Sequence, residues 1–285
     1  MSLFSNWNGK IIEEEKVFIS PSNRSFRYGD GCFETMKVVN GNLLLCDLHF
    51  QRLFSSLKLL QFTRQKNLTE GELKSQINQL VNKNGHEELA RVRLVVYRGD
   101  GGLYDVEDKN AYYIIQSWAG FTNTNVFNET GLRIGIFGDA KKTIDLFSSI
   151  KSNNYLGYAM AAMWAKEHRL DDALLMNPYN RVADATIANI FIVDRGIIKT
   201  PPLTEGCVNG VMRKYLLHCF EKEGLPHSQT EISSQDLLNA SEVFLTNATY
   251  GMRWVQQIGN NSYRNTLSSY LHKKFIIPLF TPATF

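Results

Sequence analysis

The stretch CFETMKVVNGNLLL, residues 32–45, predicts a β-hairpin early in the chain. Apolar and β-branched residues flank the pair Asn40–Gly41, and an Asn-Gly pair favours a type I′ turn because both central residues take positive φ there. The next stretch, DLHFQRLFSSLKLL at residues 47–60, repeats apolar residues at helical spacing and opens with Asp47, a candidate N-cap. A hairpin followed by an amphipathic helix indicates a mixed α/β fold.

The same alternation of helices and strands continues outward along the chain. Residues 90–99 and 111–118 have the composition of strands. The polar, glycine-flanked stretch at 119–130 shows no apolar periodicity and predicts a linker. We therefore expect a smaller α+β domain at 1–118 and a larger α/β domain at 131–285.

Composition narrows the class of protein. The chain has 285 residues, of which 44% are hydrophobic and 21% charged, and its formal net charge of +3 is too small to indicate a nucleic-acid partner. We expect no membrane span, since no run of eighteen apolar residues occurs, and no signal peptide. Four scattered cysteines and six dispersed histidines predict reduced, buried thiols, no metal site and a cytoplasmic protein.

A lysine at position 151 stands between two apolar runs, in DLFSSIKSNNYLGYAM at residues 145–160. Burial penalises the charged form of an amine, so a buried lysine has more of the neutral, nucleophilic form. Most lysines are solvated surface groups, and that interpretation competes with a catalytic one. The apolar flanks make Lys151 the candidate nucleophile.

Three further residues and one short stretch have properties that suit the binding of a charged, phosphorylated ligand. Asp184 lies in the apolar stretch RVADATIANIF, where a turn or capping role competes with that of a buried carboxylate needing a cationic partner. Gly210 in CVNGVMR precedes a helix, whose free N–H groups can bind an anion, and residues 246–249 (TNAT) add small polar groups. Arg52 has apolar neighbours, so its side chain can point inward and bind phosphate through two N–H groups.

Taken together, these residues resemble those of the fold-type IV pyridoxal-phosphate enzymes, the class IV aminotransferase family. The matching stretches, in chain order, are RYGDGCFETMKVVNG, HFQRL, IKSNNYL, ADATIANIF, CVNGVMR and VFLTNAT. Together they span nearly the whole chain. It implies an α/β fold with an α+β N-terminal domain and a larger C-terminal pseudo-barrel. It also implies pyridoxal 5′-phosphate as cofactor, a small amino substrate and a homodimer.

The resemblance further implies a role for individual residues. Lys151 matches the Schiff-base lysine, the nucleophile and base of the reaction. Asp184 stands where the family usually has a glutamate facing the pyridine nitrogen, and is one methylene shorter. The other implied cofactor-binding residues are Tyr155, which matches a tyrosine near the cofactor in part of the family, and, at the phosphate, Arg52, Val211, Met212, Ala248 and Thr249.

The sequence does not decide which arginine binds the substrate or which reaction the protein catalyses. Arg98 matches a carboxylate-binding arginine of D-amino-acid aminotransferases and an arginine of the lyases, whereas Arg93 matches its branched-chain counterpart. Their odd separation on one strand predicts that they face opposite sides. GDGCFET, YRGDGG and VNGVMR look closest to 4-amino-4-deoxychorismate lyases, which release pyruvate and form 4-aminobenzoate for folate synthesis. We expect such a lyase first and a branched-chain or D-amino-acid aminotransferase second. A cofactor-binding protein with little catalysis comes third, because Asp184 and Leu103 depart from the family pattern.

Overall fold

The computed structural model describes residues 3–66, 68–106, 108–120 and 126–280, which form two compact units. Unit 1 consists of Met1–Thr122 and Ile150–Tyr155, and unit 2 of Asn123–Ser149 and Leu156–Phe285. The short segment that carries Lys151 therefore clusters with unit 1, although it lies far along the chain. Residues 121–125 of the predicted linker lie outside the described residues, and the predicted domain limits stay a prediction.

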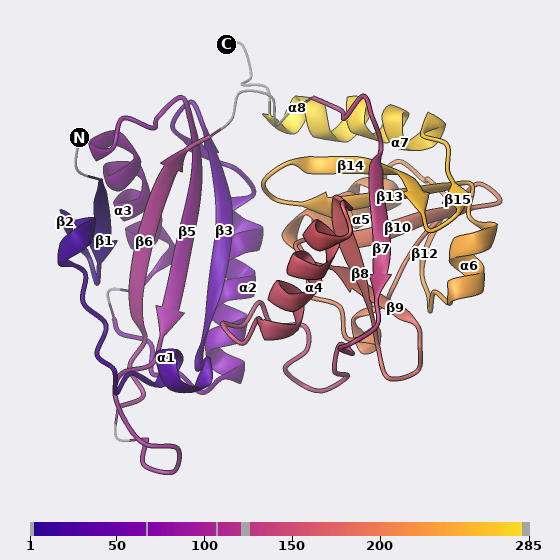
Figure 1. Ribbon diagram of the computed structural model, residues 1–285. Coiled ribbons are helices and arrows are strands. Elements are labelled where there is room, and N and C mark those ends of the chain that lie inside the picture. The colour runs from indigo at the N-terminus through magenta and orange to yellow at the C-terminus, as the bar shows by residue number, and fades with distance from the viewer. Residues whose placement is uncertain (1–2, 67, 107, 121–125, 281–285) are drawn as a thin grey trace. The chain divides into compact units, whose positions relative to one another are not determined.

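Unit 1 is built on a six-stranded antiparallel sheet in the order β2-β1-β6-β5-β3-β4 (Figure 1). Its elements are β1 (Phe4–Trp7), β2 (Lys10–Glu13), α1 (Arg24–Tyr28), β3 (Gly31–Val39), β4 (Asn42–Leu43), α2 (Cys46–Leu59), α3 (Glu70–Lys83), β5 (Leu89–Tyr97) and β6 (Tyr112–Ala119). A 3-10 turn, η1 (Glu14–Lys16), follows β2.

The predicted hairpin is confirmed. β3 and β4 meet at Asn40 and Gly41, with φ of 48° and 73°, the positive values that a type I′ turn requires. The predicted N-cap is wrong, because α2 begins at Cys46 after Leu45, whose φ is 52° and which makes no side-chain capping bond. Asp47 instead lies in the first helical turn, where a carboxylate interacts favourably with the helix dipole.

The core of unit 1 lies between this sheet and helices α2 and α3 (Figure 1). Alternate residues of a strand face the same side, so Cys32, Met36 and Val38 of β3 face the helices. Glu34 belongs by the same alternation to this apolar face, although it is charged. Phe33 lies on the opposite face of the sheet.

Unit 2 contains a nine-stranded mixed sheet with the path β12-β11-β10-β13-β14-β7-β8-β9, to which β15 adds beside β14. β9 is the last strand of this path, whereas β10 is an inner strand. The Ala185 N–H donates to Ala188 O, which closes a tight turn between β9 and β10 and brings these two strands together. The sheet is thus curled, and the predicted α/β class is confirmed.

The strands of unit 2 are β7 (Leu132–Phe137), β8 (Asp172–Met176), β9 (Val182–Ala185), β10 (Asn189–Asp194), β11 (Ile197–Thr200), β12 (His227–Gln229), β13 (Glu242–Asn247), β14 (Gly251–Ile258) and β15 (Asn261–Ser262). Its helices are α4 (Leu156–Glu167), η3 (Leu203–Glu205), α5 (Val211–Lys222), α6 (Ser234–Asn239), α7 (Thr266–Leu271), the π-helical turn η4 (His272–Ile276) and α8 (Ile277–Phe280). Among the described residues, no helix is long and apolar enough to cross a membrane.

The four cysteines carry free thiols. Cys32 and Cys207 are buried as predicted, whereas Cys46 and Cys219 are half-buried. Burial raises the pKa of both buried thiols to about 12, which keeps them protonated and inert near neutral pH.

Candidate active site

Lys151 is attached to the edge of β3 by backbone hydrogen bonds within unit 1. Phe33 N–H donates to Lys151 O at 2.9 Å, and Asn153 N–H donates to Gly31 O at 2.9 Å. The Lys151 side chain is half-buried rather than buried, and its Nζ lies 4.5 Å from the centre of the Phe33 ring and 5.4 Å from that of Tyr155. The predicted nucleophile is therefore fixed at its backbone and surrounded by aromatic rings.

Arg93 and Tyr155 contact the same Phe33 ring. The Tyr155 ring packs edge-on at 5.5 Å between centroids, and the Arg93 Cζ lies 4.2 Å from the ring centre. Arg93 pairs with Thr35 across the β3–β5 ladder, which places it on the face of the sheet that carries Phe33. Burial, with the nearby Arg91 charge, lowers the pKa of Arg93. Unit 1 thus brings a lysine, an arginine and a tyrosine together around one ring.

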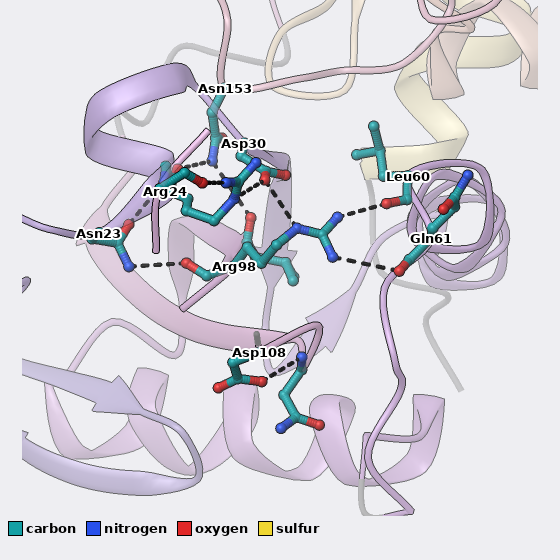
Figure 2. Close-up of polar contacts among 12 residues, drawn as sticks. Asn23, Arg24, Asp30, Leu60, Gln61, Arg98, Asp108 and Asn153 are labelled. Carbon is teal, nitrogen blue, oxygen red and sulfur yellow. Dashed lines mark hydrogen bonds and ion pairs between the residues drawn. The ribbon is translucent and has the colours of Figure 1, made fainter. Parts of the chain in front are cut away.

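Arg98 lies one residue beyond β5 and is bound inside unit 1 (Figure 2). Its Nε donates to Asp30 Oδ2 at 2.9 Å, its Nη2 to Leu60 O at 2.6 Å and its Nη1 to Gln61 O at 3.4 Å. The Cζ lies 4.0 Å from the centre of the Phe62 ring, and the residue is 6% exposed. All three guanidinium nitrogens of Arg98 are therefore engaged with the protein.

Arg24 completes this network. Its Nε donates to the same oxygen of Asp30 at 2.9 Å (Figure 2). Its Nη1 donates to the carbonyl of Gly102. The network joins the loop after β5 to the ends of α1 and α2. Arg98 is therefore held in place by groups of unit 1, and its role at a substrate stays a prediction.

Arg52 forms a buried charge cluster with two residues that sequence reasoning missed. The Arg52 Nε and Nη2 donate to Glu34 Oε1 and Oε2 at 2.8 and 2.5 Å, and His49 Nδ1 lies 2.6 Å from Glu34 Oε2. Burial alone would raise the pKa of Glu34, but the Arg52 charge and the hydrogen bonds outweigh it and lower this pKa to about 2. Arg52 does point inward, as predicted, and a carboxylate orients it there.

In unit 2, Asp184 of β9 is 2% exposed and accepts three hydrogen bonds. Asn189 Nδ2 donates to Oδ1 at 2.8 Å, while the Tyr158 hydroxyl and the Val208 N–H donate to Oδ2 at 3.1 and 2.7 Å. Burial raises the pKa of Asp184 to about 7 against the opposing effects of these donors and of Lys142. Asp184 is a buried carboxylate with ionisation near neutrality, which is typical of a functional acid.

The helix α5 begins at Val211 after Gly210, and no side chain of the described residues caps it. Its first turn also contains no acidic residue, and both Val211 and Met212 are buried. The first N–H groups of such a helix attract an anion. The predicted phosphate position at Val211 and Met212 therefore has the local structure that the role requires.

Gly210 allows Asn189 to reach Asp184. A Cβ on Gly210 would lie 1.7 Å from Asn189 Oδ1. We expect Gly210→Ala to displace Asn189 and to lower the free energy of unfolding by about 1–3 kcal/mol, measured in urea. Gly71→Ala, at an open position in α3, is the control, and stabilisation by up to about 1 kcal/mol is expected there. Equal effects of the two changes would contradict the steric account.

Ala248 and Thr249 occupy the turn between β13 and β14. Asn247 Oδ1 accepts from the N–H groups of Thr249 and Tyr250 at 2.9 and 3.0 Å, which fixes the turn. On the adjoining strand, Thr246 Oγ1 is buried and has no hydrogen-bond partner among the described residues. The role of Ala248 and Thr249 at a phosphate stays a prediction.

Sequence reasoning missed Glu34, His49, Tyr158 and Asn189. A charged residue at an apolar position of the β3 alternation was the available signal for Glu34, and the spacing of three between His49 and Arg52 was the signal for His49. Tyr158 and Asn189 carried no comparable signal, because their contacts with Asp184 depend on the fold of unit 2. Lys151 belongs to unit 1 and Asp184 to unit 2, so their common role stays a prediction.

A sequence model of the family described as amino-transferase class IV matches residues 31–258. The D-alanine aminotransferase of Bacillus licheniformis is 29% identical over 255 residues, which cover 85% of this chain and 84% of that protein. The aminodeoxychorismate lyase of Vibrio harveyi is 28% identical over 238 residues, covering 83% and 86%. The solved branched-chain aminotransferase of Thermoproteus uzoniensis has the same fold, with a TM-score of 0.87, 23% identity and coverage of 98% and 95%. These matches confirm the predicted fold type.

Proposed function

Because the chain belongs to the class IV aminotransferase family, whose enzymes depend on pyridoxal 5′-phosphate, we propose that it is an aminotransferase acting on a small amino acid. The observation that carries this choice is the contact of Arg93 and Lys151 with one Phe33 ring. By resemblance Arg93 matches the arginine of branched-chain aminotransferases, whereas Arg98 is held by Asp30. Branched-chain amino acids are therefore the first substrates to test, ahead of D-amino acids.

The residues present fit this cofactor. A buried carboxylate that ionises near neutrality, Asp184, suits a protonated ring nitrogen. The uncapped start of α5 suits a phosphate group, as does the buried hydroxyl of Thr246, which has no hydrogen-bond partner in the described part of the chain. Lys151 supplies the amine, and its backbone is fixed to β3.

When bound, pyridoxal 5′-phosphate supplies an electron sink for the charge that develops at the substrate's α-carbon. In the proposed mechanism Lys151 Nζ holds the cofactor and, as a free amine, moves the proton at that carbon. Asp184 would keep the proton on the ring nitrogen. Arg52 and the N–H groups of Val211 and Met212 would bind the phosphate, and Arg93 would orient the substrate carboxylate.

The two arginines are expected to respond differently to substitution. Arg93→Gln should raise the KM for the amino acid by about tenfold or more, since a charge-assisted hydrogen bond to the carboxylate is lost. Arg98→Gln should lower the free energy of unfolding by about 1–3 kcal/mol, because the half-buried Asp30 loses one of its two arginines and the carbonyls of Leu60 and Gln61 lose their donor. Steady-state kinetics and urea unfolding of both variants measure this difference. A KM effect confined to Arg98→Gln would contradict the assignment.

A half-reaction separates the candidate reactions. Adding L-leucine, L-valine or D-alanine alone should convert the bound cofactor to its pyridoxamine form, which absorption spectra record. Conversion by L-leucine or L-valine supports the proposal. Conversion by D-alanine but by neither branched-chain amino acid would indicate a D-amino-acid aminotransferase. A protein that binds the cofactor but converts with none of these would contradict the aminotransferase.

A 4-amino-4-deoxychorismate lyase is the second candidate, supported by the likeness to the lyase of Vibrio harveyi. Incubation with aminodeoxychorismate would then release pyruvate and 4-aminobenzoate in equal amounts. Absence of pyruvate would remove this candidate. The same assay addresses the expected link to folate synthesis.

We also propose a homodimer. The outer face of α4 is apolar and exposed in the single chain, with Leu156 at 70%, Met160 at 44% and Met163 at 55%. Exposed apolar faces of this kind are typical of interaction surfaces. Light scattering of wild type and Met160→Glu tests this: a dimer that the substitution dissociates supports the proposal, and a monomeric wild type contradicts it.

A further inference from the structure

Glu34, His49 and Arg52 form a cluster of charged and polar side chains inside the apolar core of unit 1. Glu34 and His49 are 1% and 0% exposed, and Glu34 takes a strand position that otherwise faces α2 and α3. We propose that Glu34 and His49 are positioning residues that orient the Arg52 guanidinium toward the cofactor's phosphate. This inference rests on the proposed function, because it assumes that a phosphorylated cofactor binds.

The geometry fixes the plane of the guanidinium. Glu34 accepts from Arg52 Nε and Nη2 with separate oxygens, a two-bond contact that allows little rotation. The guanidinium carries five N–H groups in a rigid plane, and this contact uses one edge. The N–H groups outside this contact lie on the other edges of the plane, so Glu34 fixes the direction in which they point.

The position of Glu34 argues against a purely stabilising role. A buried ion pair contributes little net stability compared with apolar side chains of similar volume, because both charges lose their hydration. Cys32 and Met36, the neighbours of Glu34 on the same face, show that apolar residues fill this layer. A carboxylate here is explained by what it does to Arg52, which no apolar residue can replace.

His49 holds the second oxygen of Glu34 without adding charge. Burial lowers the pKa of His49, and the nearby charges of Arg52 and Lys151 lower it further, although Glu34 opposes them. The ring is therefore neutral and its Nδ1–H donates to Glu34 Oε2. Its Nε2 is buried and has no hydrogen-bond partner among the described residues, so the ring is oriented through its Nδ1 contact with Glu34.

Two probes that differ only in the phosphate separate positioning from general stability. Binding of pyridoxal 5′-phosphate and of pyridoxal to cofactor-stripped protein would be titrated by absorbance, and folding would be checked by thermal unfolding. In Glu34→Gln we expect the Kd for pyridoxal 5′-phosphate to rise about tenfold or more, and the Kd for pyridoxal to change less than about twofold. An equal rise for both probes, or no rise for either, would overturn the inference.

A second pair of variants keeps the test decisive if Glu34→Gln does not fold. His49→Asn keeps an N–H donor near the Nδ1 position, whereas His49→Leu removes it. We expect the selective loss of pyridoxal 5′-phosphate affinity in His49→Leu and its recovery in His49→Asn. Equal affinities in these two variants would contradict the role of His49. If wild-type protein bound neither probe, the proposed function itself would fail, which is a distinct result.

Discussion

Lys151→Ala is expected to lose all measurable turnover of amino acids, a fall of at least about 10⁴-fold. The proposed mechanism assigns to one amine both the attachment of the cofactor and the movement of the proton, and alanine can do neither. The variant should still fold, because the segment is held to β3 by backbone bonds from Phe33 and Asn153 that alanine retains. Single-turnover absorption measurements with excess amino acid would show the loss.

Lys37 provides a matched control for this substitution. It is 3% exposed, and burial lowers its pKa to about 8, so it has the environment of a reactive amine without a role in the proposed mechanism. We expect Lys37→Met to keep turnover within about threefold of wild type if it folds, since no catalytic step depends on it. Loss of turnover in Lys37→Met with activity preserved in Lys151→Ala would reverse the assignment.

Asp184 is expected to make the cofactor-free protein less stable as the pH rises. Its pKa is raised by burial from 3.8 to about 7, so the folded state binds a proton that the unfolded state releases. The stabilisation is complete below about pH 4 and is lost as the pH rises through 7, with a total change on the order of 4 kcal/mol. Urea unfolding between pH 4 and 8 measures it.

The Asp184→Asn variant is the control, because asparagine does not titrate. The part of the pH dependence between 4 and 7 that belongs to Asp184 should be absent in this variant. The same variant should bind cofactor through Lys151 but turn over at a rate lower by roughly 100-fold, since a neutral amide cannot hold a proton on the ring nitrogen. An unchanged pH dependence in Asp184→Asn would show that other groups cause it.

Local patterns predicted most of the fold. The Asn40–Gly41 turn and the apolar spacing of α2 follow from short-range rules, and the structure confirms them. The start of α2 could not be predicted in the same way. Leu45 takes a positive φ that no side-chain propensity favours, so the tertiary contacts of the hairpin override the capping preference of Asp47.

Sequence patterns and the family resemblance named several candidate residues of the site, but the contacts between side chains could not be predicted from them. Sequence left open which of Arg93 and Arg98 binds a substrate. In the structure, Arg98 bonds to Asp30 and to the carbonyl groups of Leu60 and Gln61, whereas Arg93 contacts the Phe33 ring. The contact of Glu34 could not be predicted either, because its charge is compensated by Arg52 of α2, 18 positions along the chain. The family could be predicted from the resemblance. Only the side-chain contacts show that Arg98 is bound within unit 1 while Arg93 lies beside Phe33.

Covalent capture of the cofactor tests the central claim most directly. Purified protein loaded with pyridoxal 5′-phosphate would be reduced with borohydride, digested, and mapped by mass spectrometry. Three lysines in partly or fully buried surroundings can be compared: Lys37, Lys142 and Lys151. The account predicts one phosphopyridoxyl group per chain, on Lys151. A modification on Lys37 or Lys142 in its place, or none at all, would contradict it.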